Sequence, residues 1–302
     1  MADILTAGTM FPPELVSEMI NLVKGKSALA RLCAQSPIPF SGIKEFTFTL
    51  DKEVDLVAEN GAKTKGGATV EPVTIVPVKV EYGARVSDEF VKASDAVRIN
   101  YLRSFSDGFS RKVARGLDIM AIHGVNPRTN STASQLADKN FDALLADSAV
   151  QHVVTATNDA DADVESAIAM VTGEEWDVDG IAMAPAFRSS LASIKVDGKP
   201  LYESLRWGNA PADINGLALD VNGTVSFGQS LDKAIVGNFR DAFKWGIADE
   251  IAIEVIEYGN PDNDATLGDL KGHNQVYLRG ECYLGWGILA PKAFAMIKTA
   301  QG

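Results

Sequence analysis

The longest amphipathic pattern in the chain runs from Asp95 to Ile122. Apolar residues recur in it at steps of three and four, at Leu102, Phe105, Phe109, Val113, Leu117 and Met120. This spacing places them on one face of an α-helix of about seven turns, with most charged residues on the opposite face. Ser94 or Asp95 is a suitable N-cap, and Gly124 is a suitable stop signal. We therefore predict one long helix over residues 95–122.

Two glycines lie inside this predicted helix. Gly108 and Gly116 each cost roughly 1 kcal/mol relative to alanine in a helix interior. Close approach by another backbone is one physical reason for a helix to keep such residues. Taken alone, the helix fits any mixed domain, but a long hairpin precedes it and a compact α/β segment follows it. We interpret it as a spine that connects two bodies.

Alternation of apolar and polar residues predicts a long hairpin before the spine helix. The alternating apolar positions are Phe46, Phe48 and Leu50 on the outgoing strand and Val76, Val78, Val80 and Tyr82 on the returning strand. A glycine-rich polar tip at 59–72 separates them, so the hairpin covers residues 43–82. A two-stranded ribbon is only marginally stable by itself in water. The hairpin therefore projects onto a neighbouring molecule or, alternatively, pairs inside its own sheet.

Shorter helices and strands fill the rest of the chain. An irregular N-terminal arm contains a helix at 14–24 and one or two further turns at 27–33. After the spine, helices are expected at 161–171 and 185–194, and strands at 181–184, 217–221, 225–227, 235–239, 251–256 and 276–289. Helices and strands of this number and order predict an α+β fold.

Composition describes a soluble globular protein. The chain has 302 residues, of which 46% are hydrophobic and 23% are charged. Its longest uncharged apolar run, 282–291, is about half the length that a membrane span needs, and no signal-peptide pattern opens the chain. Cys33 and Cys282 lack metal-ligand spacing, so we expect reduced thiols in a cytoplasmic setting.

The net charge of −12 is unevenly distributed. The first 130 residues carry 16 Lys and Arg against 15 Asp and Glu, whereas the remainder carries 12 against 25. Neither part has the basic footprint of a dedicated nucleic-acid-binding protein, and an acidic surface repels a phosphate backbone. We therefore expect no sequence-specific binding of nucleic acid.

The motifs for nucleotide and calcium binding are incomplete. The GAKTKGG stretch at 61–67 has the glycine spacing of a P-loop, but Gly67 stands where the phosphate-binding lysine belongs. The DADAD stretch at 159–163 opens like a calcium loop, but Val164 and Met170 stand in place of the required glycine and glutamate. It is more typical of an acidic helix N-terminus.

Catalytic and metal-binding patterns are also missing. His123, His152 and His273 are scattered and form no cluster with cysteines in the sequence. No nucleophile motif with serine or cysteine is present. We therefore expect no cofactor, no metal and no catalytic residue, and we predict a structural or interaction protein. A small α/β transferase or hydrolase is the enzymatic alternative.

Four segments in order, together with the long hairpin, carry a family resemblance. They are ARVSDEFVKASDAV at 84–97, GIAMAPAFRSSLASIKVDGKPLY at 180–202, IVGNF at 235–239 and NQVYLRGECYLGWGILAPKAFAMI at 274–297. Over residues 25–298 the chain resembles the major capsid proteins of tailed phages with the Hong Kong 97-type fold.

The resemblance implies an architecture and a function. The expected parts are an N-terminal arm at 1–42, an extended hairpin (E-loop) at 43–82, a peripheral domain at 83–128 and 240–302 that contains the spine helix, and an axial domain at 129–239. The chain would then be a major capsid protein. Its copies would assemble in the host bacterial cytoplasm into pentamers and hexamers of an icosahedral shell, which in the virion encloses double-stranded phage DNA.

Partners follow from the same resemblance. Many family members begin with a charged pro-segment that scaffolds assembly, but here Met1 lies just before the arm. Scaffolding is therefore expected from a separate protein or from none, with portal and decoration proteins as further partners and no membrane. An encapsulin-like nanocompartment, which shares the fold but packages proteins, is the alternative.

Some members of this family join their subunits by isopeptide bonds between a hairpin lysine and an asparagine, with a glutamate assisting. Lys63 and Lys65 at the hairpin tip are the possible nucleophiles here, and Asn274 and Glu281 fall where the asparagine and glutamate stand in the family. The chemistry needs a neutral amine, so a lysine would have to be desolvated at a dry contact. Alternatively, Asn274 simply opens the last strand, Glu281 pairs with a cation, and both lysines are solvated.

Overall fold

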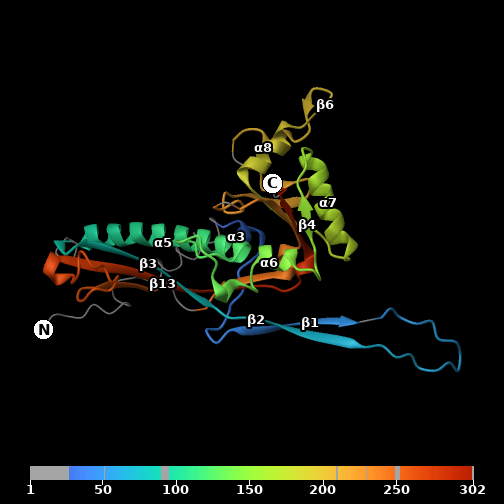
Figure 1. Cartoon of the computed structure of the whole chain (residues 1–302), viewed down its shortest axis with the longest axis horizontal. Helices are drawn as coiled ribbons and strands as arrows, with labels where there is room; N and C mark the ends of the chain where they lie inside the picture. Colours follow the sequence, from blue (N-terminus) through green and yellow to red (C-terminus); the bar gives the residue numbers. More distant parts are fainter. Residues whose placement is uncertain are drawn as a thin grey trace.

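The computed structural model describes residues 27–50, 52–89, 95–208, 210–228, 230–248 and 252–300. Figure 1 shows three parts: a long layer in which helix α5 lies along strands β3 and β13, a lobe with α7 and α8 that rises from one end of this layer, and a hairpin of β1 and β2 that extends away from both. The expected helix at 14–24 and the Ser94 cap lie outside the described residues.

The spine helix is confirmed. Helix α5 spans Asp95–His123, and all six of the predicted apolar positions on its inner face are buried or partly buried. Gly124 ends it with a left-handed φ of +64°, and its N–H donates to the carbonyl oxygen of Met120 at 3.0 Å. The regular spacing of apolar residues thus determines both the length of the helix and the face that it buries.

The explanation expected for the helical glycines is wrong within the described chain. A β-carbon at Gly108 would meet nothing within 4 Å, and one at Gly116 would meet only side-chain atoms, at 3.8 Å. The close approach between helix and sheet is made instead by the strand residue Gly280, where a β-carbon would lie 2.9 Å from the ring of Phe109. At this contact the residue without a side chain therefore belongs to the strand and not to the helix.

The hairpin is present, but its predicted returning strand is wrong. β1 (Ile43–Leu50) pairs antiparallel with β2 (Ala68–Ile75), from Ile43 opposite Ile75 to Leu50 opposite Ala68. The expected returning residues 76–82 belong mostly to β3 (Val78–Ser87), which pairs with β13 in another sheet. Both stretches alternate, and Pro77 falls in the short break between them. After this break the chain pairs with the long strand β13, which borders the core, and no longer with β1. The paired strands of the hairpin and the tip between them therefore cover residues 43–75.

The layer under the spine helix is a four-stranded antiparallel sheet. Its long central strand β13 (Gln275–Ile288) pairs on one edge with β3 and on the other with β12 (Ala252–Ile256) and β11 (Phe243–Ile247). Cys282 and Leu284 of β13 are fully buried in the same core as Leu117 of the helix. The predicted strands at 251–256 and 276–289 are confirmed within about one residue at each end.

The raised lobe contains a mixed six-stranded sheet. Its strands lie in the order β4 (Val153–Thr155), β14 (Phe294–Lys298), β10 (Asp232–Gly237), β5 (Gly180–Met183), β9 (Leu217–Val221) and β8 (Asp213–Ile214). Its helices α7 (Ala160–Gly173) and α8 (Pro185–Ser193) confirm the two predicted at 161–171 and 185–194.

Two assignments for this lobe need correction. Residues 225–227 form no strand, since 225 and 226 lie in a turn and 227 has no regular structure. β14 lies beside β10 in this sheet although the division by resemblance placed it, with 240–302, in the peripheral domain. Its five residues are nearly all apolar and are buried between two strands, a pattern that shows burial but not which sheet the strand joins.

Smaller elements complete the described chain. They are α3 (Ala28–Leu32), α6 (Phe141–Ala146), α9 (Phe239–Ala242), the strands β6 (Lys195–Val196) and β7 (Lys199–Pro200), and 3-10 turns at Ser134–Leu136, Glu203–Leu205, Lys271–His273 and Pro291–Ala293. No helix among the described residues is long and apolar enough to cross a membrane.

Candidate interaction surfaces

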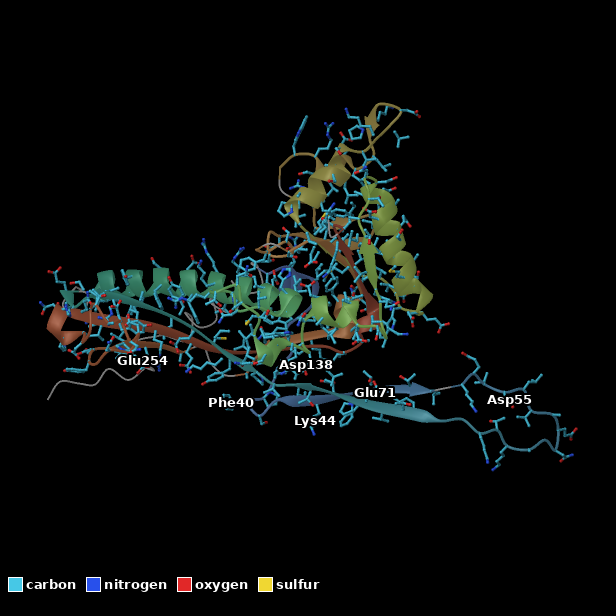
Figure 2. All side chains as sticks on the ribbon, viewed as in Figure 1. Phe40, Lys44, Asp55, Glu71, Asp138 and Glu254 are labelled. Carbon is cyan, nitrogen blue, oxygen red and sulfur yellow. The ribbon has the colours of Figure 1, made fainter. Side chains whose placement is uncertain are left out.

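The hairpin carries the most exposed apolar side chains of the described chain. Phe46 and Phe48 on β1 are each 64% exposed, and Val54 and Leu56 in the tip are 97% and 98% exposed. In Figure 2 the labelled Asp55 lies toward the far end of the hairpin, away from the layer of the spine helix and from the raised lobe. Apolar residues gathered in this way mark a protein interaction site.

The root of the hairpin, by contrast, is fixed to the body. Ile75 is fully buried, and β13 has glycines at 285 and 287 where Ile75 crosses it. Lys244 of β11 donates to Glu45 of β1 at 2.8 Å. The hairpin is therefore held at its root, whereas farther out its apolar side chains Phe46, Phe48, Val54 and Leu56 are exposed among the described residues.

Residues 27–29, the first described residues of the N-terminal arm, are held to the spine helix by a buried carboxylate. The Asp118 carboxylate, fully buried on the spine helix, accepts the backbone N–H groups of Ala28 at 2.9 Å and Leu29 at 3.2 Å and also the hydroxyl of Ser27. Thr224 donates its hydroxyl to the same carboxylate at 2.7 Å. Burial raises the pKa of Asp118, and the four donors oppose that shift.

The cross-link candidates are dispersed in one subunit. Lys63 and Lys65 are exposed at the hairpin tip, and Asn274 precedes β13 in a left-handed conformation with φ +51°. Glu281 lies seven residues farther along the same strand, which separates it from Asn274 by roughly 23 Å at the usual rise of a β-strand. One chain therefore does not bring the three kinds of residue together.

Glu281 already has partners. Lys79 lies 2.7 Å from one carboxylate oxygen, and the hydroxyl of Tyr283 donates to the other at 2.9 Å. The hydrogen bond from Lys79 holds the pKa of Glu281 below its usual range. A carboxylate that is stabilised in this way is a weaker base for a proton transfer.

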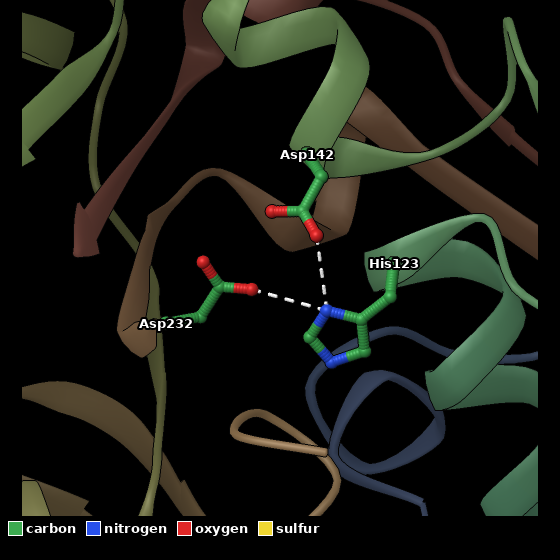
Figure 3. Close-up of side chains that lie close together, drawn as sticks. All are labelled: His123, Asp142 and Asp232. Atoms are coloured by element: carbon green, nitrogen blue, oxygen red, sulfur yellow. Dashed lines mark hydrogen bonds and ion pairs between the residues drawn. The ribbon is translucent and has the colours of Figure 1, made fainter. Parts of the chain in front are cut away.

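A cluster that the sequence did not predict joins the spine helix to the raised lobe. Figure 3 shows His123, at the end of α5, with its Nδ1 3.0 Å from a carboxylate oxygen of Asp142 and 3.0 Å from one of Asp232. Lys298 of β14 donates to Asp142 at 2.5 Å and lies 3.2 Å from Asp232. Four separate segments, α5, α6, β10 and β14, meet at this point.

Hydrogen bonding makes the imidazole of His123 a cation. Its Nε2 donates to the carbonyl oxygen of Thr224 at 2.9 Å, while Nδ1 faces the two carboxylates. Burial lowers the pKa of His123, but the hydrogen bonds to Asp142 and Asp232 outweigh it and raise this pKa to about 9. With Lys298, the cluster contains two positive and two negative groups.

His123, Asp142 and Asp232 bring three possible metal-ligand atoms within 4.8 Å of one another. Both imidazole nitrogens are occupied by hydrogen bonds, however, and the ammonium of Lys298 neutralises the carboxylates. A metal ion would have to displace a proton and this ammonium. The four charged side chains therefore form an ion network between the spine helix and the raised lobe. Thr224 connects this network to Asp118, because its carbonyl oxygen accepts a hydrogen bond from His123 and its hydroxyl donates one to Asp118.

Comparison with known proteins identifies the family. Residues 7–299 match the sequence model of the phage capsid family. A structure from Mycobacterium phage Ogopogo is similar at 29% identity, with a TM-score of 0.76 over 91% of this chain and 92% of that one. A structure from Gordonia phage Cozz is similar at 22% identity, with a TM-score of 0.74 over 91% and 86%. None of the curated proteins matches the sequence.

The chain therefore belongs to the phage capsid family. It is a major capsid protein of the Hong Kong 97-type fold, a structural protein of the virion whose copies form an icosahedral shell. The family, the fold and this function were all predicted from the sequence and are confirmed. The hairpin, the arm and the ion network are accordingly parts of a subunit built for assembly.

Proposed function

We propose that the shell is built from pentamers and hexamers of this chain and encloses double-stranded phage DNA. The observation that supports this most is the hairpin, whose tip residues Val54 and Leu56 are almost fully exposed in the single subunit. A capsid of an empty GTA particle has the same fold at 14% identity and a TM-score of 0.64, over 91% of this chain and 90% of that one.

In this proposal each predicted part of the subunit has its own role in the shell. The hairpin reaches neighbouring copies, while the arm at 1–42 is anchored in its own subunit through residues 28–30. The peripheral part forms the layer with the spine helix, and the axial part at 129–239 surrounds the local symmetry axes. β14 is added to the axial sheet in this scheme because it pairs there. The ion network around His123 then sets the angle between peripheral and axial parts.

Assembly takes place in the host bacterial cytoplasm in this proposal. A scaffolding protein, a portal and decoration proteins are the expected further partners of the shell. The DNA is held by enclosure rather than by sequence-specific contacts, since a subunit with a net charge of −12 attracts no phosphate backbone overall.

The isopeptide cross-link stays a prediction. The Nζ of Lys63 or Lys65 in one subunit would attack the side-chain carbonyl carbon of Asn274 in another, with release of ammonia and transfer of the amine proton to Glu281. Asn274 and Glu281 are distant in one chain, so the base would come from a different subunit from the asparagine. The ion pair of Glu281 with Lys79 opposes this role, and a shell held by non-covalent contacts is the alternative.

The test is the mass and shape of the purified protein. Light scattering and negative-stain microscopy are expected to show capsomers or closed shells of megadalton mass, and DNA-filled particles after infection. A monodisperse monomer at every pH and salt concentration would contradict the proposal. Shells that contain host proteins rather than DNA would support the nanocompartment alternative.

A further inference from the structure

The spine helix and the turn after it concentrate positive charge in an acidic chain. Residues 98–128 make up about a tenth of the sequence but hold five of its eleven arginines, and they carry six Lys and Arg against two Asp. One of these acids, Asp118, is fully buried and accepts hydrogen bonds from the segment 27–29. The other, Asp107, forms an exposed pair with Arg111 at 2.7 Å. The outward charge of this stretch is therefore positive, although the net charge of the chain is −12.

The cations lie on the exposed side of α5. Phe109 faces the sheet, where a β-carbon on Gly280 of β13 would meet its ring. Figure 1 shows α5 along one side of this layer and strands β3 and β13 along the other. The turn after the helix adds an exposed cation, Arg128. The exposed cations of the helix itself are Arg103, Arg111, Lys112 and Arg115.

Most of these cations have no acid to neutralise them within the subunit. Among the described residues, no carboxylate lies within ion-pair distance of Arg103, Lys112 or Arg128. The guanidinium of Arg115 lies 5.3 Å from the ring centre of Phe227, a contact that leaves its charge in place. The chain has 40 Asp and Glu against 28 Lys and Arg, so acids are in excess. A group of unpaired cations in such a chain indicates that their counter-charge comes from outside the subunit.

The opposite face of the same layer has its cations paired. Gly280 of β13 faces α5, so the alternation of the strand turns its neighbours Arg279 and Glu281 to the other side. There Arg279 donates to Glu254 at 2.7 Å, and Lys79 lies 2.7 Å from Glu281. The sheet face is thus neutralised by its own ion pairs, whereas the helix face keeps a positive charge.

The helix face has the chemistry of a phosphate contact. From Arg103 to Arg115 its cations extend over roughly 18 Å at the usual rise of an α-helix. Four of the five exposed cations are arginines, whose planar guanidinium binds a phosphate through two parallel hydrogen bonds. Duplex DNA offers about one phosphate charge per 1.7 Å of its axis. The fully exposed positions between 103 and 115 include no apolar side chain, although a protein partner would need apolar anchors there.

We propose that the exposed face of α5, together with Arg128, contacts the phosphate backbone of the enclosed double-stranded DNA without regard to sequence. The inference rests on the proposed function, which supplies the enclosed DNA. It adds which face of the spine layer is the inner one and which side chains touch the DNA. The acidic remainder of the chain confines the contact to this face.

A photo-cross-linking amino acid tests the contact in filled particles. In one variant p-benzoylphenylalanine takes the place of Gly108, where a β-carbon would meet nothing within 4 Å and which lies one turn before Lys112 on the exposed face. In the matched control it takes the place of Glu254, which is exposed on the side of the layer opposite α5 (Figure 2). After irradiation, DNA cross-links from position 108 are expected to be at least about tenfold more abundant than those from position 254.

Equal cross-linking from the two positions, or more from position 254, would overturn the proposal and leave the enclosure of DNA intact. Cross-links from position 108 to another protein instead of DNA would also overturn it and would identify a protein partner on this face. Particles of the wild type that never fill with DNA would contradict the proposed function itself.

The affinity of dissociated subunits for DNA tests the charges directly. A fluorescent duplex of about 30 bp with random sequence is titrated at about 50 mM and about 200 mM salt. We expect a triple variant to bind at least about tenfold more weakly at the lower salt concentration. The slope of log K against log salt should fall by about 2 to 3, since each phosphate contact contributes about 0.9. This variant combines Arg103→Gln, Lys112→Gln and Arg128→Gln.

Two controls separate the helix face from the total charge. A second triple variant removes the same charge from exposed positions elsewhere and should keep the wild-type slope; it combines Lys195→Gln, Lys199→Gln and Arg240→Gln. Arg103→Lys with Arg128→Lys keeps the charge of the helix face and should also keep the slope. Equal losses in the two triple variants, or a wild type that does not bind the duplex at about 50 mM salt, would overturn the proposal.

Discussion

A β-carbon placed on Gly287 of β13 would lie 2.7 Å from Cγ1 of Ile75, the fully buried residue at the root of the hairpin. The two residues thus pack with no space between them. Ile75 is also the last residue of β2, so this contact fixes the direction in which the hairpin leaves the body. A subunit that reaches its neighbours through a ribbon needs such a fixed point.

Gly287→Ala is expected to destabilise the subunit by roughly 1–3 kcal/mol, because the added methyl group overpacks the contact with Ile75. Urea unfolding of dissociated subunits measures the change. Gly272→Ala is the control, since a β-carbon there would meet nothing within 4 Å. Equal stability of the two variants would show that the root tolerates the added volume.

Asp118→Ala should cost about 3 kcal/mol or more, because it leaves the N–H groups of Ala28 and Leu29 and the hydroxyl of Thr224 without their acceptor in a buried site. The first visible effect is expected to be faster proteolysis near Ser27, because the hydrogen bonds that hold this segment to the helix are lost. On the same helix, Asp107→Ala removes only an exposed pair with Arg111 and should change stability by less than about 0.5 kcal/mol.

Removal of residues 54–65 should leave a folded subunit that does not assemble normally. The segment contributes no residue to the buried core of the described chain, and β1 still pairs with β2 beyond the deletion. Circular dichroism checks folding, and sedimentation velocity checks assembly, which is expected to fail because a large intersubunit contact is lost. An unfolded variant would place the hairpin tip in the subunit core and contradict this account.

Stability should fall as the pH rises toward 9. The pKa of His123 is raised from 6.5 to about 9 in the folded state, so its stabilising effect is fully present below pH 6.5 and is lost as the pH rises through 9. The loss should reach roughly 2–3 kcal/mol.

Thermal melting of dissociated subunits from pH 6.5 to 9.5 measures this decline. His123→Gln should be less stable at pH 6.5 and should lose much less on going to pH 9. His273→Gln, which changes an exposed histidine, should keep the wild-type slope. Parallel slopes for the wild type and His123→Gln would show that the network around His123 does not carry the effect.

Local patterns predicted the regular elements well. The spacing of apolar residues along α5 fixes its length, because a helix face repeats within the sequence itself. The hairpin was recognised for the same reason, yet its returning strand was misplaced, because 68–75 and 76–82 both alternate. Only the pairing of β3 with the distant β13 separates them, and no local pattern records that partner.

The ion network illustrates what the sequence cannot show. His123, Asp142, Asp232 and Lys298 come from segments that are far apart along the chain, and each alone is an ordinary polar residue. The one available signal was a histidine in the last turn of a long helix, where a positive charge is favoured. The candidate cross-link residues came from family resemblance alone, and in one subunit they are dispersed.

The central claim is that the hairpin is stabilised by a neighbouring copy in a shell. A reconstruction of the assembled particle by electron cryomicroscopy, at a resolution that shows side chains, tests it most directly. We expect Phe46, Phe48, Val54 and Leu56 to be buried against a second subunit while Ile75 keeps its place against Gly287. A hairpin that lies exposed in the assembled particle, or that folds back on its own subunit, would contradict the account.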